Sequence, residues 1–187
     1  MISQSRRTLL GRLAVLPLAA LAGACSKADV VNAFVTRDGY DVVEDLAYGT
    51  HERQRLDVYR PHSATGSSPV VVFFYGGGWN SGERGDYLFV GQRLAAAGFI
   101  VVIPDYRVLP EVAFPDFLED SAQAVAWVGR NIAEYGGDPD RVGMAGHSAG
   151  AYNAMMLALD VRYLEAEGWS ADRIGAVAGL AGPYDFR

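Results

Sequence analysis

The run Val70–Tyr75 (VVVFFY) constrains the fold of this chain more than any other segment. This continuous stretch of β-branched and aromatic residues is too short for a helix, and it suits a strand that is buried on both faces of a parallel sheet. Phe99–Ile103 is a second run of this kind, and Pro104 ends it. Buried parallel strands need helices on both faces of the sheet, so helices should separate the strands along the chain.

Helices and further strands are expected around these two runs. The spacing of apolar residues predicts helices over Asp86–Ala97, Pro115–Ala133 and Ala149–Leu159. Additional strands are expected at Asp41–Ala47, Arg55–Tyr59, Arg141–Ala145 and Ile174–Leu180. Strands that alternate with helices imply βαβ units. The sequence therefore predicts an α/β fold with a mostly parallel sheet and helices on both faces.

Residues 1–24 have the composition of an export signal. Arg6 and Arg7 form a basic start, and Leu13–Ala24 is an apolar stretch of twelve residues. A bilayer requires roughly 20 residues, so this stretch suits a signal peptide better than a membrane span. The run Ser5–Leu10 (SRRTLL) resembles a twin-arginine export signal.

Cys25 ends this segment and is the only cysteine of the chain. The preceding residues, Ala22-Gly23-Ala24, make the site resemble a bacterial lipobox, in which the cysteine thiol is acylated and becomes the first residue of the mature protein. We therefore expect a lipid-anchored protein exported to the bacterial cell envelope, in the periplasm or at the outer membrane. Residues 25–40 are then anchor and linker, and residues 41–187 form the folded domain.

The charge of the chain argues against nucleic acid as a partner. The formal net charge is −6, and the signal-like residues 1–24 contain three arginines and no acid. Without them, 13 basic residues face 22 acidic ones, a net charge of −9. A body this acidic is repelled by nucleic acid and by anionic lipid.

The motif Gly146-His147-Ser148-Ala149-Gly150 matches G-x-S-x-G. It follows a predicted strand and opens a predicted helix, which is the context of a sharp turn that lifts a nucleophilic serine out of a sheet. The two glycines remove side chains that would clash in so tight a bend. The sequence thus indicates Ser148 as a candidate nucleophile.

Gly76-Gly77-Gly78 directly follow the strand Val70–Tyr75. Three glycines let the backbone come close to a ligand and expose its N–H groups. Such donors stabilise the negative charge that acyl transfer builds on a carbonyl oxygen. A phosphate-binding loop is the alternative, but the spacings G-x-G-x-x-G and G-K-[S/T] are absent.

The chain resembles the hormone-sensitive-lipase and carboxylesterase branch of the α/β-hydrolases, near the isoprenylcysteine-methylesterase-like members. Four segments carry the resemblance over residues 40–187: Gln54–Pro61 (QRLDVYRP), Tyr75–Gly82 (YGGGWNSG), Asp105–Pro110 (DYRVLP) and Tyr135–Ser148 (YGGDPDRVGMAGHS). The resemblance implies an α/β-hydrolase fold, a small-molecule ester as substrate, and neither cofactor nor metal.

The resemblance also implies roles for single residues. Ser148 would be the nucleophile, and the backbone N–H groups of Gly77, Gly78 and Ala149 would form the oxyanion hole. Tyr75 stands where the family usually has His before the glycines.

In this family the triad acid and then the His follow the serine, after the seventh and eighth strands. Six strands are expected here, and no His follows His147. The last strands, the triad acid and the triad His are therefore expected to lie beyond residue 187.

The histidines and acids that are present suit structural roles better than catalysis. His147 should point away from the Ser148 hydroxyl, and His51 and His62 are expected in turns at the surface. Several aspartates lie in loop signatures: Asp105, Asp138, Asp140 and Asp185. Arg107 is expected to hold its loop by ion pairing.

Three functions remain open from the sequence. The first is an esterase of which these residues are the N-terminal part, and whose 187 residues alone should be inactive. The second is a truncated, inactive hydrolase or a binding protein. The third is a serine peptidase of the prolyl-oligopeptidase kind, although propeller-like repeats are absent. The natural substrate and the oligomeric state are not determined by these residues.

Overall fold

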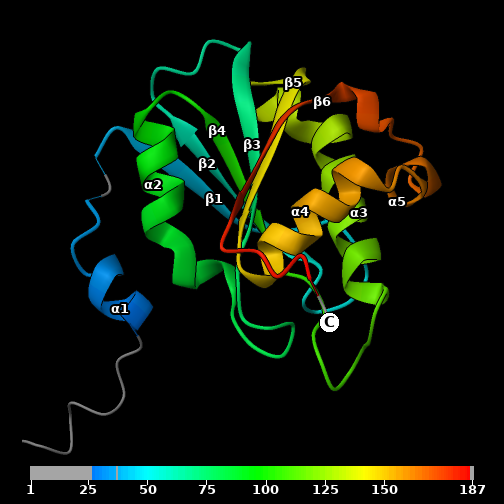
Figure 1. Cartoon of the computed structure of the whole chain (residues 1–187). Coiled ribbons are helices and arrows are strands. Elements are labelled where there is room, and N and C mark those ends of the chain that lie inside the picture. Colours follow the sequence, from blue (N-terminus) through cyan, green and yellow to red (C-terminus); the bar gives the residue numbers. More distant parts are fainter. Residues whose placement is uncertain (1–26, 37, 186–187) are drawn as a thin grey trace, which may run out of the picture.

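A computed structural model describes residues 27–36 and 38–185 and contains a six-stranded sheet in the order β1-β2-β4-β3-β5-β6 (Figure 1). The strands are β1 (Tyr40–Ala47), β2 (Arg55–Pro61), β3 (Ser68–Phe74), β4 (Ile100–Pro104), β5 (Gly137–His147) and β6 (Ile174–Leu180). The strands β4, β3, β5 and β6 are parallel, whereas β1 and β2 pair antiparallel at one edge. The predicted α/β fold with a mostly parallel sheet is confirmed.

Helices cover both faces of the sheet (Figure 1). The α-helices are α1 (Lys27–Asn32), α2 (Leu88–Ala96), α3 (Asp116–Asn131), α4 (Ala149–Leu159) and α5 (Arg162–Ala166). Three 3-10 turns accompany them: η2 (Arg84–Tyr87), η3 (Ile132–Tyr135) and η4 (Ala171–Arg173). The helices α1 and α2 lie on one side of the sheet, and α3, α4 and α5 on the other (Figure 1).

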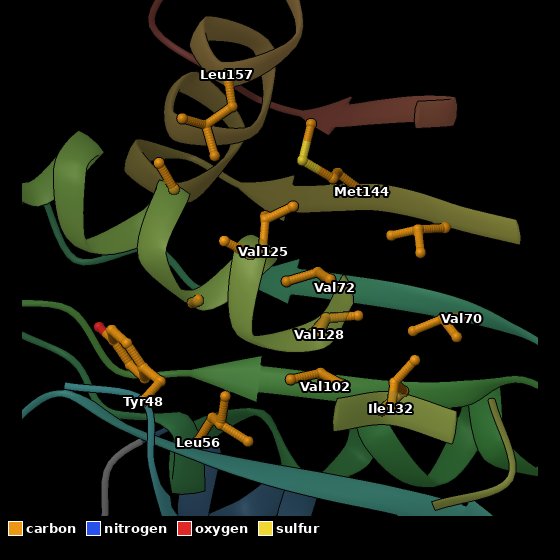
Figure 2. Packing of buried hydrophobic residues seen from close by; sticks show 14 of the residues in the cluster. Tyr48, Leu56, Val70, Val72, Val102, Val125, Val128, Ile132, Met144 and Leu157 are labelled. Carbon is orange, nitrogen blue, oxygen red and sulfur yellow. The ribbon is translucent and has the colours of Figure 1, made fainter. Parts of the chain in front are cut away.

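Alternate residues of the central strands belong to two different hydrophobic clusters, because successive side chains of a strand point to opposite faces. Val72 and Val102 join Val125 and Val128 of α3 in the larger cluster (Figure 2). The neighbouring residues of the same strands face α2 in the second cluster: Phe73, Val101 and Ile103. Both faces of β4 and of the last three residues of β3 are thus buried, which explains their unbroken apolar sequence.

Within residues 25–40, which were expected to be anchor and linker, Lys27–Asn32 form the helix α1. The side chain of Asn32 holds this helix against the domain: its amide donates to the carbonyl of Gly85 at 2.9 Å and of Asp86 at 3.4 Å, and its oxygen accepts from the Phe89 N–H at 3.2 Å. These partners lie more than 50 residues away. Six residues without a hydrophobic period gave no sign of the helix.

The expected export signal of residues 1–24 and the expected lipidation site Cys25 lie outside the described residues. Within the part of the chain that is described, no helix is long and apolar enough to cross a bilayer.

Candidate active site

Ser148 is the single residue between the end of β5 and the start of α4. Its backbone has φ 52° and ψ −119°, a conformation that residues other than glycine rarely adopt. Such strain costs on the order of 1–3 kcal/mol and persists where the surrounding structure enforces it. Here the Ser148 N–H donates to the carbonyl of Leu180 at 2.8 Å, and its carbonyl accepts from the N–H of Ala151 and of Tyr152.

The two glycines of the motif are required by close backbone contacts. A Cβ at Gly146 would collide with the backbone carbonyl of Gly150. A Cβ at Gly150 would collide with the carbonyl oxygens of Phe74 and Tyr75, at the end of β3. The sharp turn that the sequence predicted is therefore present, with strand before and helix after it.

The residues 76–82, here called the glycine loop, begin two residues after the end of β3 and lie against the Ser148 turn. A Cβ at Gly76 would lie 2.9 Å from the His147 Nδ1 and 3.0 Å from the Ser148 Cβ. Gly77 (φ 152°) and Gly78 (φ 60°) have backbone conformations that favour glycine. The carbonyl of Gly77 accepts the N–H of Asn80 at 3.1 Å and of Ser81 at 3.2 Å, so it turns into the loop.

The three predicted oxyanion donors are Gly77, Gly78 and Ala149. Within residues 27–36 and 38–185, neither the Gly77 N–H nor the Gly78 N–H donates to a protein acceptor. Ala149 is the first residue of α4, where a helical N–H has no acceptor within its own helix. The structure brings the glycine loop and the start of α4 to the same place, beside Ser148.

Trp79 connects the glycine loop to α4. Its indole Nε1–H donates to the Oδ1 of Asn153 at 2.9 Å, and the Asn153 amide donates to the Oγ of Ser121 in α3 at 3.2 Å. Asn153 and Ser121 are fully buried. A buried polar network with paired donors and acceptors holds one geometry, so the loop is fixed relative to the helix that starts after Ser148.

An apolar hollow of about 440 Å³ adjoins the glycine loop and α4. Its lining residues are Trp79, Leu109, Phe114, Phe117 and Tyr152. Trp79 follows the three glycines, and the Tyr152 N–H donates to the Ser148 carbonyl. Because every lining side chain is apolar or aromatic, the hollow suits an uncharged, apolar group of a ligand.

The three histidines have partners other than the Ser148 hydroxyl. His147 Nδ1 lies 2.8 Å from the Tyr87 hydroxyl. His62 is at the surface, as predicted, with Nε2 3.2 Å from Asp41. His51 lies in the turn between β1 and β2 with its side chain 28% exposed, and its Nε2 lies 2.5 Å from the Glu111 carboxylate.

Of the aspartates expected in loops, Asp105 directly follows β4, whereas Asp138 and Asp140 lie within β5, which begins at Gly137. Arg107 forms an ion pair with Asp120 at 2.7 Å, which confirms its predicted role, and this hydrogen bond raises the pKa of the Arg107 guanidinium. Asp105 pairs with Arg84, a partner that the sequence did not indicate. Asp140 pairs with Arg173 at 2.6 Å.

Tyrosine hydroxyls add a second network at this edge of the sheet. Arg53 donates to the Tyr75 hydroxyl at 2.8 Å, and the Tyr106 hydroxyl donates to the Tyr75 carbonyl at 2.8 Å. The two rings stack with centroids 4.7 Å apart. Burial raises the pKa of both phenols. The Tyr75 side chain thus packs under the glycine loop, with its ring against Gly82.

Sequence reasoning missed Tyr87, Asn153 and the pairing of His51 with Glu111. Tyr87 and His147 are 60 residues apart, and Trp79 and Asn153 are 74 apart. No local pattern marks such pairs. Among the described residues, no group of three or more His, Cys, Asp or Glu side chains could hold a metal ion.

Comparison with known proteins agrees with this geometry. The family model BD-FAE matches residues 56–187. A probable isoprenylcysteine alpha-carbonyl methylesterase of Oryza sativa subsp. japonica is 40% identical over 150 residues, which cover 78% of this chain and 35% of that protein. A probable carboxylic ester hydrolase of Mycobacterium tuberculosis is 36% identical over 149 residues, or 76% of this chain and 35% of that protein.

Solved structures give the same result. A bacterial heroin esterase superposes with a TM-score of 0.73 at 26% identity, covering 84% of this chain and 49% of the other. The chain spans about a third of the length of the two curated relatives named above. With its sheet order, its Ser148 turn and these matches, the chain belongs to the BD-FAE family, and its relatives are α/β-hydrolase carboxylesterases and methylesterases.

Proposed function

We propose that this chain carries the nucleophile and the oxyanion hole of a serine carboxylesterase. The strained backbone of Ser148, held between β5 and α4 and against three glycines, is the observation that carries the proposal. A protein retains strain of this kind where the position of one side chain matters more than its cost in stability.

The chemistry follows the usual course of acyl transfer. The Ser148 Oγ attacks the carbonyl carbon of an ester and gives its proton to a base, and the N–H groups of Gly77, Gly78 and Ala149 stabilise the carbonyl oxygen as it becomes negative. The alcohol leaves with a proton, and water then hydrolyses the acyl-serine. An apolar acyl or alcohol group of the substrate occupies the hollow beside Trp79.

The base for this reaction is not supplied by the described residues. His51 contacts Glu111, His62 contacts Asp41 and His147 contacts Tyr87. This observation favours a second candidate, a hydrolase-like binding protein that retains the nucleophile side of the pocket. In the first candidate, the acid and the His belong to residues beyond position 187.

Covalent labelling of Ser148 tests the proposal. The full-length protein, meaning a chain that includes the residues beyond position 187, should react with a fluorophosphonate at Ser148 and hydrolyse short aryl esters. Ser148→Ala should abolish labelling and lower kcat on the order of 10⁶-fold. Ser170→Ala, at an exposed position in the turn before η4, is the matched control and should leave both unchanged. Full turnover by Ser148→Ala would refute the assignment, and absence of turnover in the wild type would favour the binding protein.

We also propose that the protein is exported and anchored to the cell envelope by lipid on Cys25. The basic start, the short apolar stretch and the position of the single cysteine support this. Cells grown with labelled fatty acid should incorporate label into the wild type and not into Cys25→Ala. Equal labelling of the two proteins would contradict the anchor.

A further inference from the structure

Tyr87 lies outside every motif that the sequence singled out, yet it contacts both halves of the candidate site. It ends the turn η2, just before α2. Its ring packs among other aromatic rings, with centroids 5.4 Å from Phe73, 5.7 Å from Phe89 and 6.2 Å from Tyr75. This packing limits the movement of the ring and so defines where its hydroxyl lies.

The Tyr87 hydroxyl makes two hydrogen bonds. The Gly76 N–H donates to it at 3.3 Å, and its oxygen lies 2.8 Å from the His147 Nδ1. A phenol hydroxyl can accept one hydrogen bond while it donates another. Because the oxygen accepts from Gly76, we expect its O–H to donate to the His147 Nδ1, with the ring proton of a neutral His147 on Nε2.

The two partners of Tyr87 are the neighbours of the reacting groups. Gly76 precedes Gly77, a proposed oxyanion donor, and His147 precedes Ser148, the proposed nucleophile. One side-chain oxygen therefore connects the glycine loop to the Ser148 turn. The Trp79 to Asn153 hydrogen bond makes a second connection on the other side of the glycines.

We propose that Tyr87 is a positioning residue that sets the distance between the oxyanion donors and the Ser148 Oγ through its bonds to Gly76 and His147. The inference rests on the proposed function, since the distance matters only if Ser148 attacks an ester. Tyr87 does not contact the reacting atoms in this role. Its hydroxyl acts on the rate because oxyanion donors stabilise charge only within about 2.7–3.1 Å of the developing oxyanion.

The substitution Tyr87→Phe keeps the ring packing and removes only the hydroxyl. In the full-length protein acting on 4-nitrophenyl butyrate, it should lower kcat by roughly 10- to 100-fold, the range expected from misplacing a reacting group by about an ångström. KM should change less than about twofold, because the apolar hollow that binds the substrate is untouched. Labelling of Ser148 by a fluorophosphonate should slow in proportion to kcat.

Tyr135→Phe is the matched control, since Tyr135 lies in η3 and packs against Trp127, away from the site. It should leave kcat and KM unchanged. An unchanged kcat in Tyr87→Phe, while Ser148→Ala is inactive, would overturn the positioning role alone. Equal turnover by the wild type and Ser148→Ala would instead overturn the proposed function.

The hydrogen bond itself has a spectroscopic signature that is independent of turnover. In ¹⁵N NMR of the wild type at a pH where His147 is neutral, Nδ1 should be the unprotonated acceptor and Nε2 should carry the proton. Tyr87→Phe should shift the ring toward a mixture of both tautomers. The same tautomer population in both proteins would contradict the bond and with it the proposal.

Discussion

The strands β4 and β6 belong to the same parallel part of the sheet, but they differ in burial. All five residues of β4 are buried, whereas five of the seven residues of β6 are exposed. The strand β4 lies between β2 and β3, and β6 pairs only with β5 in the part of the chain that is described (Figure 1). Both strands have an uncharged sequence that is compatible with burial. Their difference in burial among the described residues comes from the strands that lie next to them.

The exposure extends from β6 onto the adjoining face of the sheet. Two largely apolar hollows, of about 530 and 460 Å³, lie on the α2 side of β5 and β6. Leu94, Ala145 and Ala178 line both of them. On this side, α2 covers the sheet next to β4, and no described helix covers β6. Among the described residues, the sheet therefore has a closed end around β4 and an end at β6, here called the open end, that no described helix covers on the α2 side.

Substitutions in two ion pairs should give the largest difference in the free energy of unfolding between these ends. Asp120 is fully buried beside Arg107, whereas Asp140 and Arg173 form an exposed pair. Arg107→Met leaves a buried carboxylate without its counter-ion and should lower the free energy of unfolding by about 3–5 kcal/mol. Arg173→Met should cost under about 1 kcal/mol. Urea denaturation measures the free energy of unfolding of both variants. Equal losses would contradict the expected difference between the buried and the exposed ion pair.

Matched valines test the packing of the two strands. Val102 in β4 is fully buried in the larger cluster, and Val177 in β6 is partly buried. Val102→Ala should lower the free energy of unfolding by about 2–3 kcal/mol, because it removes buried methyl groups and leaves a cavity. Val177→Ala should cost under about 1 kcal/mol. A larger loss for Val177 would show that β6 is covered in solution.

Alkaline pH should lower the stability of the fold through the buried Tyr75 phenol, which lies in the closed end. Burial raises the pKa of the Tyr75 phenol, so the folded chain keeps a proton that the unfolded chain releases near pH 10. The stability from this group is complete below pH 10 and is lost as the pH rises above it. Between pH 9 and 11, the free energy of unfolding of Tyr75→Phe should fall by about 1 kcal/mol less than that of the wild type.

Tyr184→Phe is the control for this measurement, since Tyr184 follows β6 and is 54% exposed. Its stability should follow the wild-type curve more closely than that of Tyr75→Phe. The same pH dependence for the wild type and Tyr75→Phe would contradict the predicted cost of ionising the buried phenol.

A charge on the open end should have the smallest effect on stability. Among the described residues Ala178 is exposed in β6, and in a protein of these 187 residues alone the unpaired apolar edge would promote association between chains. Ala178→Lys should change the free energy of unfolding by under about 0.5 kcal/mol and should shift the protein toward monomer in size exclusion. Ala178→Ser adds no charge and should leave the association unchanged. Continued association of Ala178→Lys would locate the contact elsewhere.

Local sequence predicted most of the elements and the core of the candidate site. The helix Ala149–Leu159 and the strand Ile174–Leu180 have the expected bounds. The strand expected at Arg141–Ala145 is longer, and β5 runs from Gly137 to His147. These features were accessible because apolar period, strand composition and the glycines of a tight turn act over a few residues.

The contacts that hold the site together were not accessible from local sequence. The helix α1 depends on Asn32 bonding to backbone more than 50 residues away. The Tyr87 to His147 bond and the Trp79 to Asn153 bond join residues 60 and 74 positions apart. A tyrosine or an asparagine is compatible with many surroundings, so only the folded chain shows which partner each has.

By itself, the sequence determined the α/β alternation and the strand–Ser148–helix turn, because backbone sterics and the burial of apolar runs are set by neighbouring residues. The tertiary structure alone decided that β4 is enclosed between β2 and β3, and that Tyr87 bridges the glycine loop and His147. Burial depends on which strand lies next to which, and a hydrogen bond depends on where two distant segments meet. Both are settled only when the sheet assembles.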